Sequence, residues 1–232
     1  MTQPSVDQER TVQLAARALA RAGLVHAYGH CSLRLDAAHF LVCAPRPLGL
    51  VGGAPGSVVP VHGSLPEGVL GEVRAHQSVY RRRSDVRGIC RIMPPALMAL
   101  STQSVVPRAR HGIGAYFHPG PRLWDDPRLL RDDARAAALA EELGSANAIV
   151  MRGNGALVVA DGLPKAVVLS WFLEDAARIE RDVLAMGFAG DGGLLNDEEI
   201  QARRVFTGGV VERMWDWLTR DFDAAIDSLP RT

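Results

Sequence analysis

The stretch VLGEVRAHQSVYRRRSDVRGICRIMPP, residues 69–95, carries the pattern that decides the fold. Residues 69–82 have the apolar spacing of a helix, and on it Glu72 and His76 share one face because they are four residues apart. Residues 86–92 are a short apolar run that is typical of a buried strand. A helix followed at once by a buried strand indicates an α/β domain.

The sequence on either side of this stretch predicts further helices and strands. Ser5 and Gln8 have the spacing of a capping box, and they precede an amphipathic helix that Gly23 ends. Further strands are expected at 31–35, 39–43, 58–61, 148–151 and 156–160, a loop at 108–121, and helices at 96–102, from Asp126-Pro127 to Gly144, at 164–186 and at 197–226. We therefore expect a three-layer α/β/α fold, whose mainly antiparallel sheet is covered by helices on both faces.

The charge balance argues against nucleic acid as a partner. The 232 residues contain 26 basic and 26 acidic side chains, and no basic run exceeds Arg81-Arg82-Arg83. The N-terminus lacks the pattern of a secretory signal, and no apolar run approaches the roughly 20 residues of a membrane span. We expect a cytoplasmic protein without a membrane partner.

Two residue counts limit the possible chemistry. Because 25 of the 26 basic residues are arginine, Lys165 is the single lysine, and its place at the start of a helix predicts a solvated side chain rather than an imine-forming one. Cys31, Cys43 and Cys90 are odd in number and lie in apolar runs, which predicts buried free thiols.

The order of motifs resembles the class II aldolase/adducin family over roughly residues 8–186. Its parts are Glu72, the segment YRRRSDV at 80–86, the strand that ends at Pro94-Pro95, and the turn RGNG at 152–155. The segment GHCSLR at 29–34 is similar to the family's anion-binding turn, in the variant found in its aromatic-acid decarboxylase branch. The resemblance implies a class II aldolase-like fold, a homotetramer with active sites between subunits, and Glu72 as the catalytic carboxylate.

The sequence departs from the family at the metal site. The family holds a divalent metal with an HxH pair on the strand and a third His in a later HG turn, but here these positions are Arg91-Ile92-Met93 and Asn154-Gly155. A guanidinium on a ligand position disfavours Zn or Mn. We expect no metal there and no cofactor.

These observations predict a carbon–carbon lyase, a decarboxylase or an aldolase, that acts on a small anionic, aromatic or keto-acid substrate. Arg91 would stabilise the developing oxyanion, Glu72 would move a proton, and His76 is a second acid or base candidate. The expected substrate-binding residues are His30, Ser32, Arg152, Asn154, His111 and His118.

Two other classes of protein stay open. A non-catalytic, adducin-like interaction module is favoured if Arg91 pairs tightly with Glu72 and no cavity is present. An Fe(II) oxygenase requires that His111 and His118 join His30 or His76 in a new iron or manganese site.

The division into domains is a further expectation. Residues 1–190 are expected to form the aldolase-like domain, and residues 191–232 a helical tail whose Trp215 and Trp217 pack on a neighbouring subunit.

Overall fold

The computed structural model describes residues 2–220 and 222. The strands of this part of the chain are β1 (His30–Arg34), β2 (His39–Val42), β3 (Ser57–Pro60), β4 (Gly88–Ile92), β5 (Arg122–Trp124), β6 (Ala148–Met151) and β7 (Ala156–Ala160). The helices are α1 (Val6–Arg21), α2 (Val73–Arg82), α3 (Pro95–Ser101), α4 (Asp133–Leu143), α5 (Leu163–Ala185), α6 (Asp197–Arg203) and α7 (Val210–Thr219), with short 3-10 turns η1 (Leu48–Leu50) and η2 (Gly114–Phe117).

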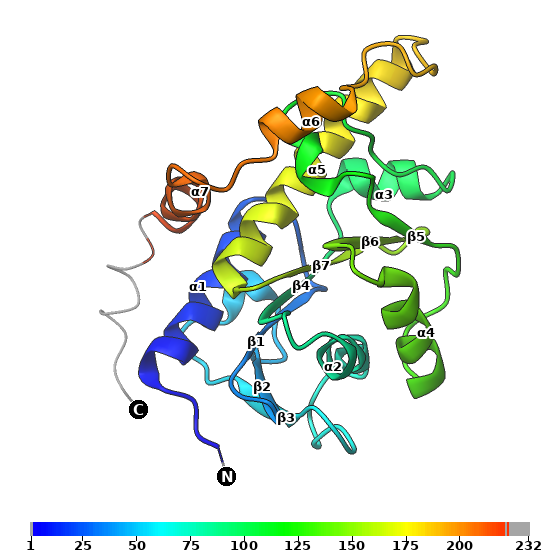
Figure 1. Ribbon diagram of the computed structural model, residues 1–232. Helices are drawn as coiled ribbons and strands as arrows, with labels where there is room; N and C mark the ends of the chain where they lie inside the picture. The colour runs from blue at the N-terminus through cyan, green and yellow to red at the C-terminus, as the bar shows by residue number, and fades with distance from the viewer. Residues whose placement is uncertain (1, 221, 223–232) are drawn as a thin grey trace.

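The strands form one sheet in the order β3-β2-β1-β4-β7-β6-β5 (Figure 1). Neighbouring strands are antiparallel except β5 and β6, which run parallel. The expected α/β fold with a mainly antiparallel sheet is therefore confirmed.

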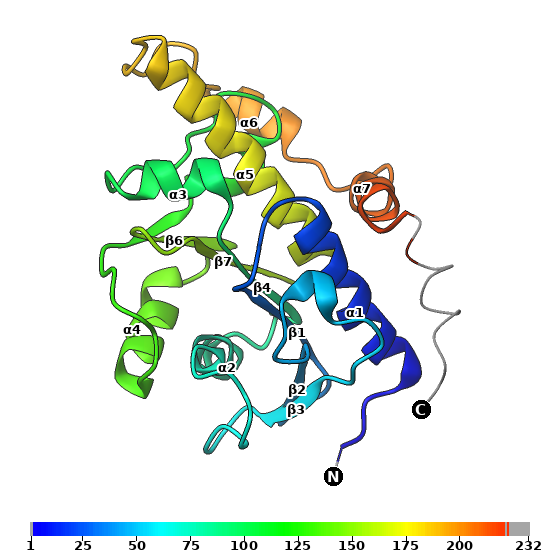
Figure 2. The same ribbon diagram turned by 180° about the vertical axis from the view of Figure 1, so that it is seen from behind.

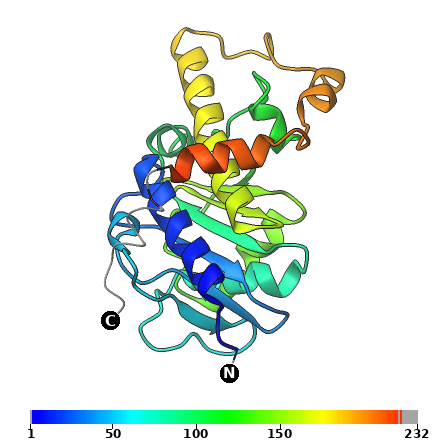
Figure 3. The same ribbon diagram turned by 90° about the vertical axis from the view of Figure 1, so that its left-hand side faces the viewer.

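Helices cover both faces of this sheet. Figures 1 and 2 show α1 and α5 on one face and α2 and α4 on the other, and the hydrophobic core fills the space between the layers. Helix α7 lies across α1 and α5 (Figure 3). None of the described helices is long and apolar enough to cross a membrane.

Local sequence explains where the first helix begins. The hydroxyl of Ser5 accepts from the backbone N–H of Gln8, and the Gln8 side chain accepts from the backbone N–H of Ser5. These two hydrogen bonds satisfy donors that a helix start otherwise leaves unpaired, so the capping box sets the start of α1.

Three elements differ from the expectation. The helix expected at 69–82 begins only at Val73, with Glu72 as its N-cap residue. Asp126 does not cap a helix, because its carboxylate binds the neighbouring Arg128, and α4 begins only after Asp132, whose side chain accepts from the backbone N–H of Arg135. The three residues of β5 were not expected as a strand; they are short and depend on pairing with β6.

The expected helix at 197–226 is interrupted. Residues 204–209 separate α6 from α7, and Gly208 and Gly209 have φ of 78° and 73°, which no helix accommodates. Residues 221 and 223–226 of that expected helix lie outside the described residues.

The tail is packed on its own chain. Trp215 is partly buried against the core, and Trp217, 49% exposed, meets Trp171 of α5 edge to face. Packing of residues 191–232 on a neighbouring subunit stays a prediction.

Candidate active site

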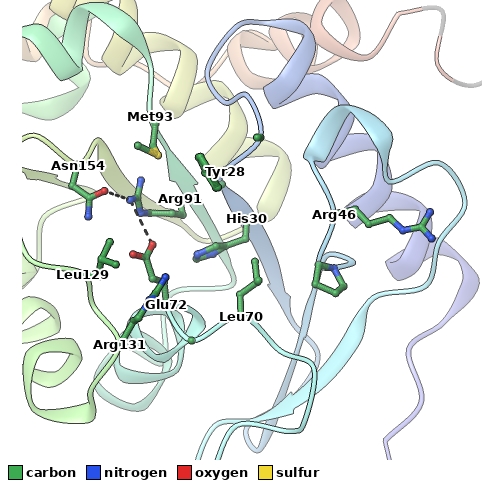
Figure 4. Close-up of a pocket in the computed structure, with 14 residues that line it drawn as sticks. Tyr28, His30, Arg46, Leu70, Glu72, Arg91, Met93, Leu129, Arg131 and Asn154 are labelled. Atoms are coloured by element: carbon green, nitrogen blue, oxygen red, sulfur yellow. Dashed lines mark hydrogen bonds and ion pairs between the residues drawn. The ribbon is translucent and has the colours of Figure 1, made fainter.

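The candidate site is a pocket of about 520 Å³ at one end of strands β1 and β4 (Figure 4). Its walls come from six segments of the chain, which are far apart in sequence. The lining residues are Ala27, Tyr28, Gly29, His30, Pro45, Arg46, Leu70, Gly71, Glu72, Arg91, Met93, Leu129, Arg131 and Asn154.

Arg91 holds the centre of the pocket. Its side chain is only 3% exposed, and its Nη1 donates to the Ile92 carbonyl at 2.8 Å. Its Nη2 donates to Oδ1 of Asn154 at 2.8 Å and lies 3.6 Å from Oε2 of Glu72. A buried cation needs such partners, and these three oxygens supply them.

The turn of Asn154 is brought to Arg91 by Gly155. Gly155 has a φ of 70°, and a Cβ there would collide with the carbonyl of Ile92 and lie 2.9 Å from the Cα of Met93. Only glycine permits this approach of the β6–β7 turn to the end of β4. The predicted anion-binding turn is held in a similar way, since a Cβ at Gly29 would lie 3.0 Å from the Arg91 carbonyl.

Glu72 is the N-cap residue of α2, just before its first turn, and faces Arg91 across the pocket. Its side chain is 21% exposed, so the carboxylate reaches both the guanidinium and the pocket interior. The 3.6 Å separation exceeds an ordinary hydrogen bond. The carboxylate is therefore near the buried cation without being closed off by it.

His76 and His30 form a hydrogen-bonded pair beside the pocket. His76, predicted to share a helix face with Glu72, is fully buried, and its Nε2 lies 2.9 Å from Nδ1 of His30. On its other side, Nδ1 of His76 lies 2.7 Å from the hydroxyl of Ser32. Since His30 lines the pocket, His76 lies behind it, one residue away from the cavity.

Burial makes both histidines neutral. It lowers the pKa of His30 to about 3, with the positive charge of Arg91 as the second cause. Burial likewise holds the pKa of His76 well below its usual value, with further contributions from His30 and Arg91. At neutral pH each ring therefore carries a single proton.

Four predicted substrate-binding residues do not line this pocket. Ser32 is fully buried and its hydroxyl contacts His76, which lies behind His30. Arg152 forms an ion pair with Asp125, His111 binds Asp175 at 3.0 Å, and His118 lies 3.9 Å from Asp197. The substrate-binding roles of these four residues stay predictions.

The pocket also contains residues that sequence reasoning did not select. Arg46 and Arg131 are exposed cations at its rim, and within the described part of the chain no carboxylate forms an ion pair with either. Tyr28, Leu70 and Leu129 add exposed apolar surface, and Tyr28 is 70% exposed. All five lie in loops, although Leu70, Leu129 and Arg131 were expected in helices that begin only at Val73 and Asp133. Only the fold brings these five residues together.

The residues at the expected ligand positions do not fit a divalent metal. Arg91, Met93 and Asn154 offer a cation, a thioether and an amide, and the guanidinium already uses the amide oxygen. Elsewhere in the described chain, no three His, Cys, Asp or Glu side chains come together in a way that could hold an ion.

Lys165 and the cysteines lie away from the pocket. Lys165 pairs with Asp161 at 3.0 Å and lies over the ring of Phe206, so it is partly covered rather than fully solvated. Cys31, Cys43 and Cys90 are buried free thiols, as expected.

Solved structures confirm the fold. L-fuculose-1-phosphate aldolase from Thermus thermophilus matches with a TM-score of 0.72 and 24% identity, over 80% of this chain and 98% of that one. The L-fuculose 1-phosphate aldolase from Glaciozyma antarctica matches with a TM-score of 0.77 and 18% identity, over 97% and 96%. YgbL from Klebsiella pneumoniae, a proposed aldolase/epimerase/decarboxylase, matches with a TM-score of 0.69 and 25% identity, over 85% and 97%.

The sequence comparisons define the family. No curated protein matches the chain closely enough to count as a relative. Residues 10–181, however, match the family described as the class II aldolase and adducin N-terminal domain. The matched segment contains the whole sheet and the pocket. The chain therefore belongs to the class II aldolase and adducin family.

Proposed function

We propose that this protein is a carbon–carbon lyase, of the decarboxylase or aldolase type, for a small anionic substrate that is aromatic or a keto acid. The observation that carries the proposal is the buried Arg91 guanidinium, which lies between Asn154 and Glu72 at the wall of an open pocket. Arg91 would supply the cation and Glu72 the proton carrier that such a reaction requires.

The charge of the pocket favours an anionic substrate. Three arginines and one carboxylate line it: Arg91 inside, Arg46 and Arg131 at the rim, and Glu72 opposite Arg91. A substrate carboxylate therefore enters a site of net positive charge, where a guanidinium binds it through paired hydrogen bonds.

Decarboxylation is the reaction that we assign first. The bond between the substrate carbon and its carboxylate breaks, CO₂ leaves, and the electron pair delocalises onto an adjacent oxygen that Arg91 stabilises. Glu72 takes up a proton from solvent and gives it to the carbon. In the aldolase alternative, the Glu72 carboxylate removes the proton of the substrate hydroxyl and the adjacent carbon–carbon bond breaks to release an aldehyde. The electron pair passes to the enolate oxygen, which Arg91 stabilises.

The experiment is an assay of CO₂ release and of aldehyde release, with a panel of hydroxyaromatic acids and keto acids. Once a substrate is found, Glu72→Gln is expected to lower kcat by between about 100-fold and 10,000-fold, which is the range of a lost acid–base group. The matched control is Glu142→Gln, an exposed position on α4 outside the pocket, which should keep full activity. Full turnover by Glu72→Gln would contradict the proposed role.

The two rival functions receive less support. A non-catalytic module would be favoured by a tight Arg91–Glu72 pair without a cavity, whereas the atoms are 3.6 Å apart and border a cavity of about 520 Å³. An iron oxygenase would need His111 and His118 beside His30 or His76. Stoichiometric iron in protein purified without chelator would favour that function.

We further propose that the protein is a homotetramer with sites between subunits. The supporting observation is the exposed apolar rim of the pocket, formed by Tyr28, Leu70 and Leu129.

A further inference from the structure

A buried chain of hydrogen bonds leads from the interior to the pocket. The hydroxyl of Tyr80 lies 2.9 Å from that of Ser32, which lies 2.7 Å from Nδ1 of His76. Nε2 of His76 lies 2.9 Å from Nδ1 of His30. All four side chains are almost completely buried, and only His30 borders the pocket.

The hydroxyl groups give this chain a direction. A buried tyrosine O–H has to donate, and its nearest acceptor is the Ser32 hydroxyl at 2.9 Å, whereas the Ser32 carbonyl lies at 3.2 Å. The serine proton is then directed to Nδ1 of His76. Their 2.7 Å separation is the usual length for a hydroxyl donor and is short for an N–H donor.

The same donor–acceptor order continues through the two histidines, because a neutral ring has one N–H donor and one acceptor nitrogen. Because His76 accepts on Nδ1, its single proton is on Nε2, and this N–H donates to Nδ1 of His30. His30 then accepts on Nδ1, and its own single proton is on Nε2. Burial and the charge of Arg91 lower the pKa of both rings, which supports their being uncharged.

Two donors at the pocket wall lack an acceptor in the described chain. They are Nε2 of His30 and Nε of Arg91, both buried. His30 and Arg91 are directly paired residues of β1 and β4, so their side chains leave the same face of the sheet. The His30 ring points into the space that Glu72 and Arg91 border (Figure 4).

We propose that Ser32 and His76 are positioning residues that hold His30 as an uncharged Nε2–H donor, which together with Nε of Arg91 binds a carboxylate or oxyanion oxygen of the substrate. A neutral imidazole holds such an oxygen without protonating it, so the positive charge comes from Arg91 alone. The identity of the oxygen rests on the proposed function, whereas the proton position on His30 does not.

The opposite direction of the chain makes a different prediction. If Tyr80 donated to the Ser32 carbonyl and Ser32 donated to Tyr80, then Nδ1–H of His76 would donate to Ser32. His30 would then be protonated on Nδ1, and its Nε2 would be an acceptor. The two directions therefore differ in one observable, which is the nitrogen of His30 that carries the proton.

The test is a long-range ¹H–¹⁵N NMR spectrum of the full chain, labelled in the histidine rings, at pH 7. The signals of His30 and His76 are assigned with His30→Gln and His76→Gln. We expect both rings to be neutral and protonated on Nε2. A His30 ring protonated on Nδ1, or on both nitrogens, overturns the proposal. Because no turnover is measured, failure of the lyase assay leaves this result intact.

Two variants test the positioning role. Ser32→Ala removes the hydroxyl that fixes His76, so His30 should show a mixture of both neutral forms. Tyr80→Phe removes a buried hydroxyl but leaves His76 as the acceptor for Ser32, so His30 should stay protonated on Nε2. An unchanged His30 form in Ser32→Ala overturns the role of Ser32. A His30 ring that becomes protonated on Nδ1 in Tyr80→Phe overturns the proposed direction of the chain.

Benzoate serves as the carboxylate probe. Added to the wild-type protein, it should shift the Nε2–H signal of His30 and leave that of the exposed His62 unchanged. Equal effects on both signals, or none on His30 at a concentration that shifts the Arg91 Nε–H signal, overturn the donor role.

Discussion

Burial lowers the pKa of both Arg91 and His30 at the pocket wall, but it leaves the two side chains in different charge states. Arg91 and His30 are neighbours on paired strands, each 3% exposed, yet one stays a cation and the other is held neutral. The difference follows from their ordinary pKa values, because burial lowers both but only the histidine starts near neutral pH.

The neutral histidines predict how stability depends on pH. His30 has a folded pKa of about 3 against an unfolded value of 6.5, and the pKa of His76 is lowered as well. Below pH 6.5 the unfolded chain binds protons that the folded chain does not. The contribution of His30 is therefore complete above pH 6.5 and is lost as the pH falls toward 3, by roughly 1 kcal/mol per pH unit. The contribution of His76 is lost in the same direction.

The measurement is the urea midpoint between pH 7 and pH 5, a window above the titration of ordinary carboxylates. His62→Gln changes an exposed ring and should keep the same slope, whereas His76→Gln should reduce it. Equal midpoints at pH 5 and pH 7 in the wild-type protein would contradict the neutral state of the pair.

At the scale of elements, the turn between β6 and β7 decides whether Asn154 reaches Arg91. Gly153 and Gly155 flank Asn154 with φ of 63° and 70°, but only Gly155 lies against the backbone of Ile92 and Met93. Alanine at Gly153 therefore introduces only the strain of a positive φ, whereas alanine at Gly155 adds a steric clash with the backbone of β4.

We expect Gly153→Ala to lower the free energy of unfolding by about 1 to 2 kcal/mol, which is the cost of the left-handed conformation alone. Gly155→Ala should cost more than this, because the added Cβ pushes β7 away from β4, and it should also reduce the proposed lyase activity by displacing Asn154. Urea denaturation of both variants measures the difference. Equal losses of stability would mean that the close approach has no energetic consequence.

At the scale of the whole molecule, Glu180 of α5 joins segments that are distant in sequence. Its side chain is 1% exposed and accepts from Arg108 Nε at 3.0 Å and Arg110 Nε at 2.7 Å. The same arginines donate to carbonyls of residues 188–192, which lead into the tail. This carboxylate therefore fixes residues 188–192 against α5 through Arg108 and Arg110.

Glu180→Gln should lower the free energy of unfolding by about 3 kcal/mol, because it leaves the buried Arg110 without its counter-charge. Limited proteolysis should also become faster within residues 187–196. Asp191→Asn, which removes an exposed partner of Arg108, is the control and should have a far smaller effect. If both variants lose the same stability, the buried carboxylate is not what fixes the tail.

The sequence by itself determined the local elements and the family. The Ser5–Gln8 capping box, the helical spacing from Glu72 to His76 and the apolar run of β4 depend on neighbouring residues only, so their signals are readable in the chain. The replacement of the expected metal ligands by Arg91, Met93 and Asn154 was visible for the same reason.

The tertiary structure alone decided the contacts between distant segments. Strand β5 exists because β6 pairs with it, and His76 lies behind His30 because α2 packs over β1, 46 residues away along the chain. The rim cations Arg46 and Arg131 come from two unrelated loops. Side-chain burial, strand pairing and pKa depend on which segments lie in contact in the folded chain. No local pattern in the sequence specifies contacts between distant segments.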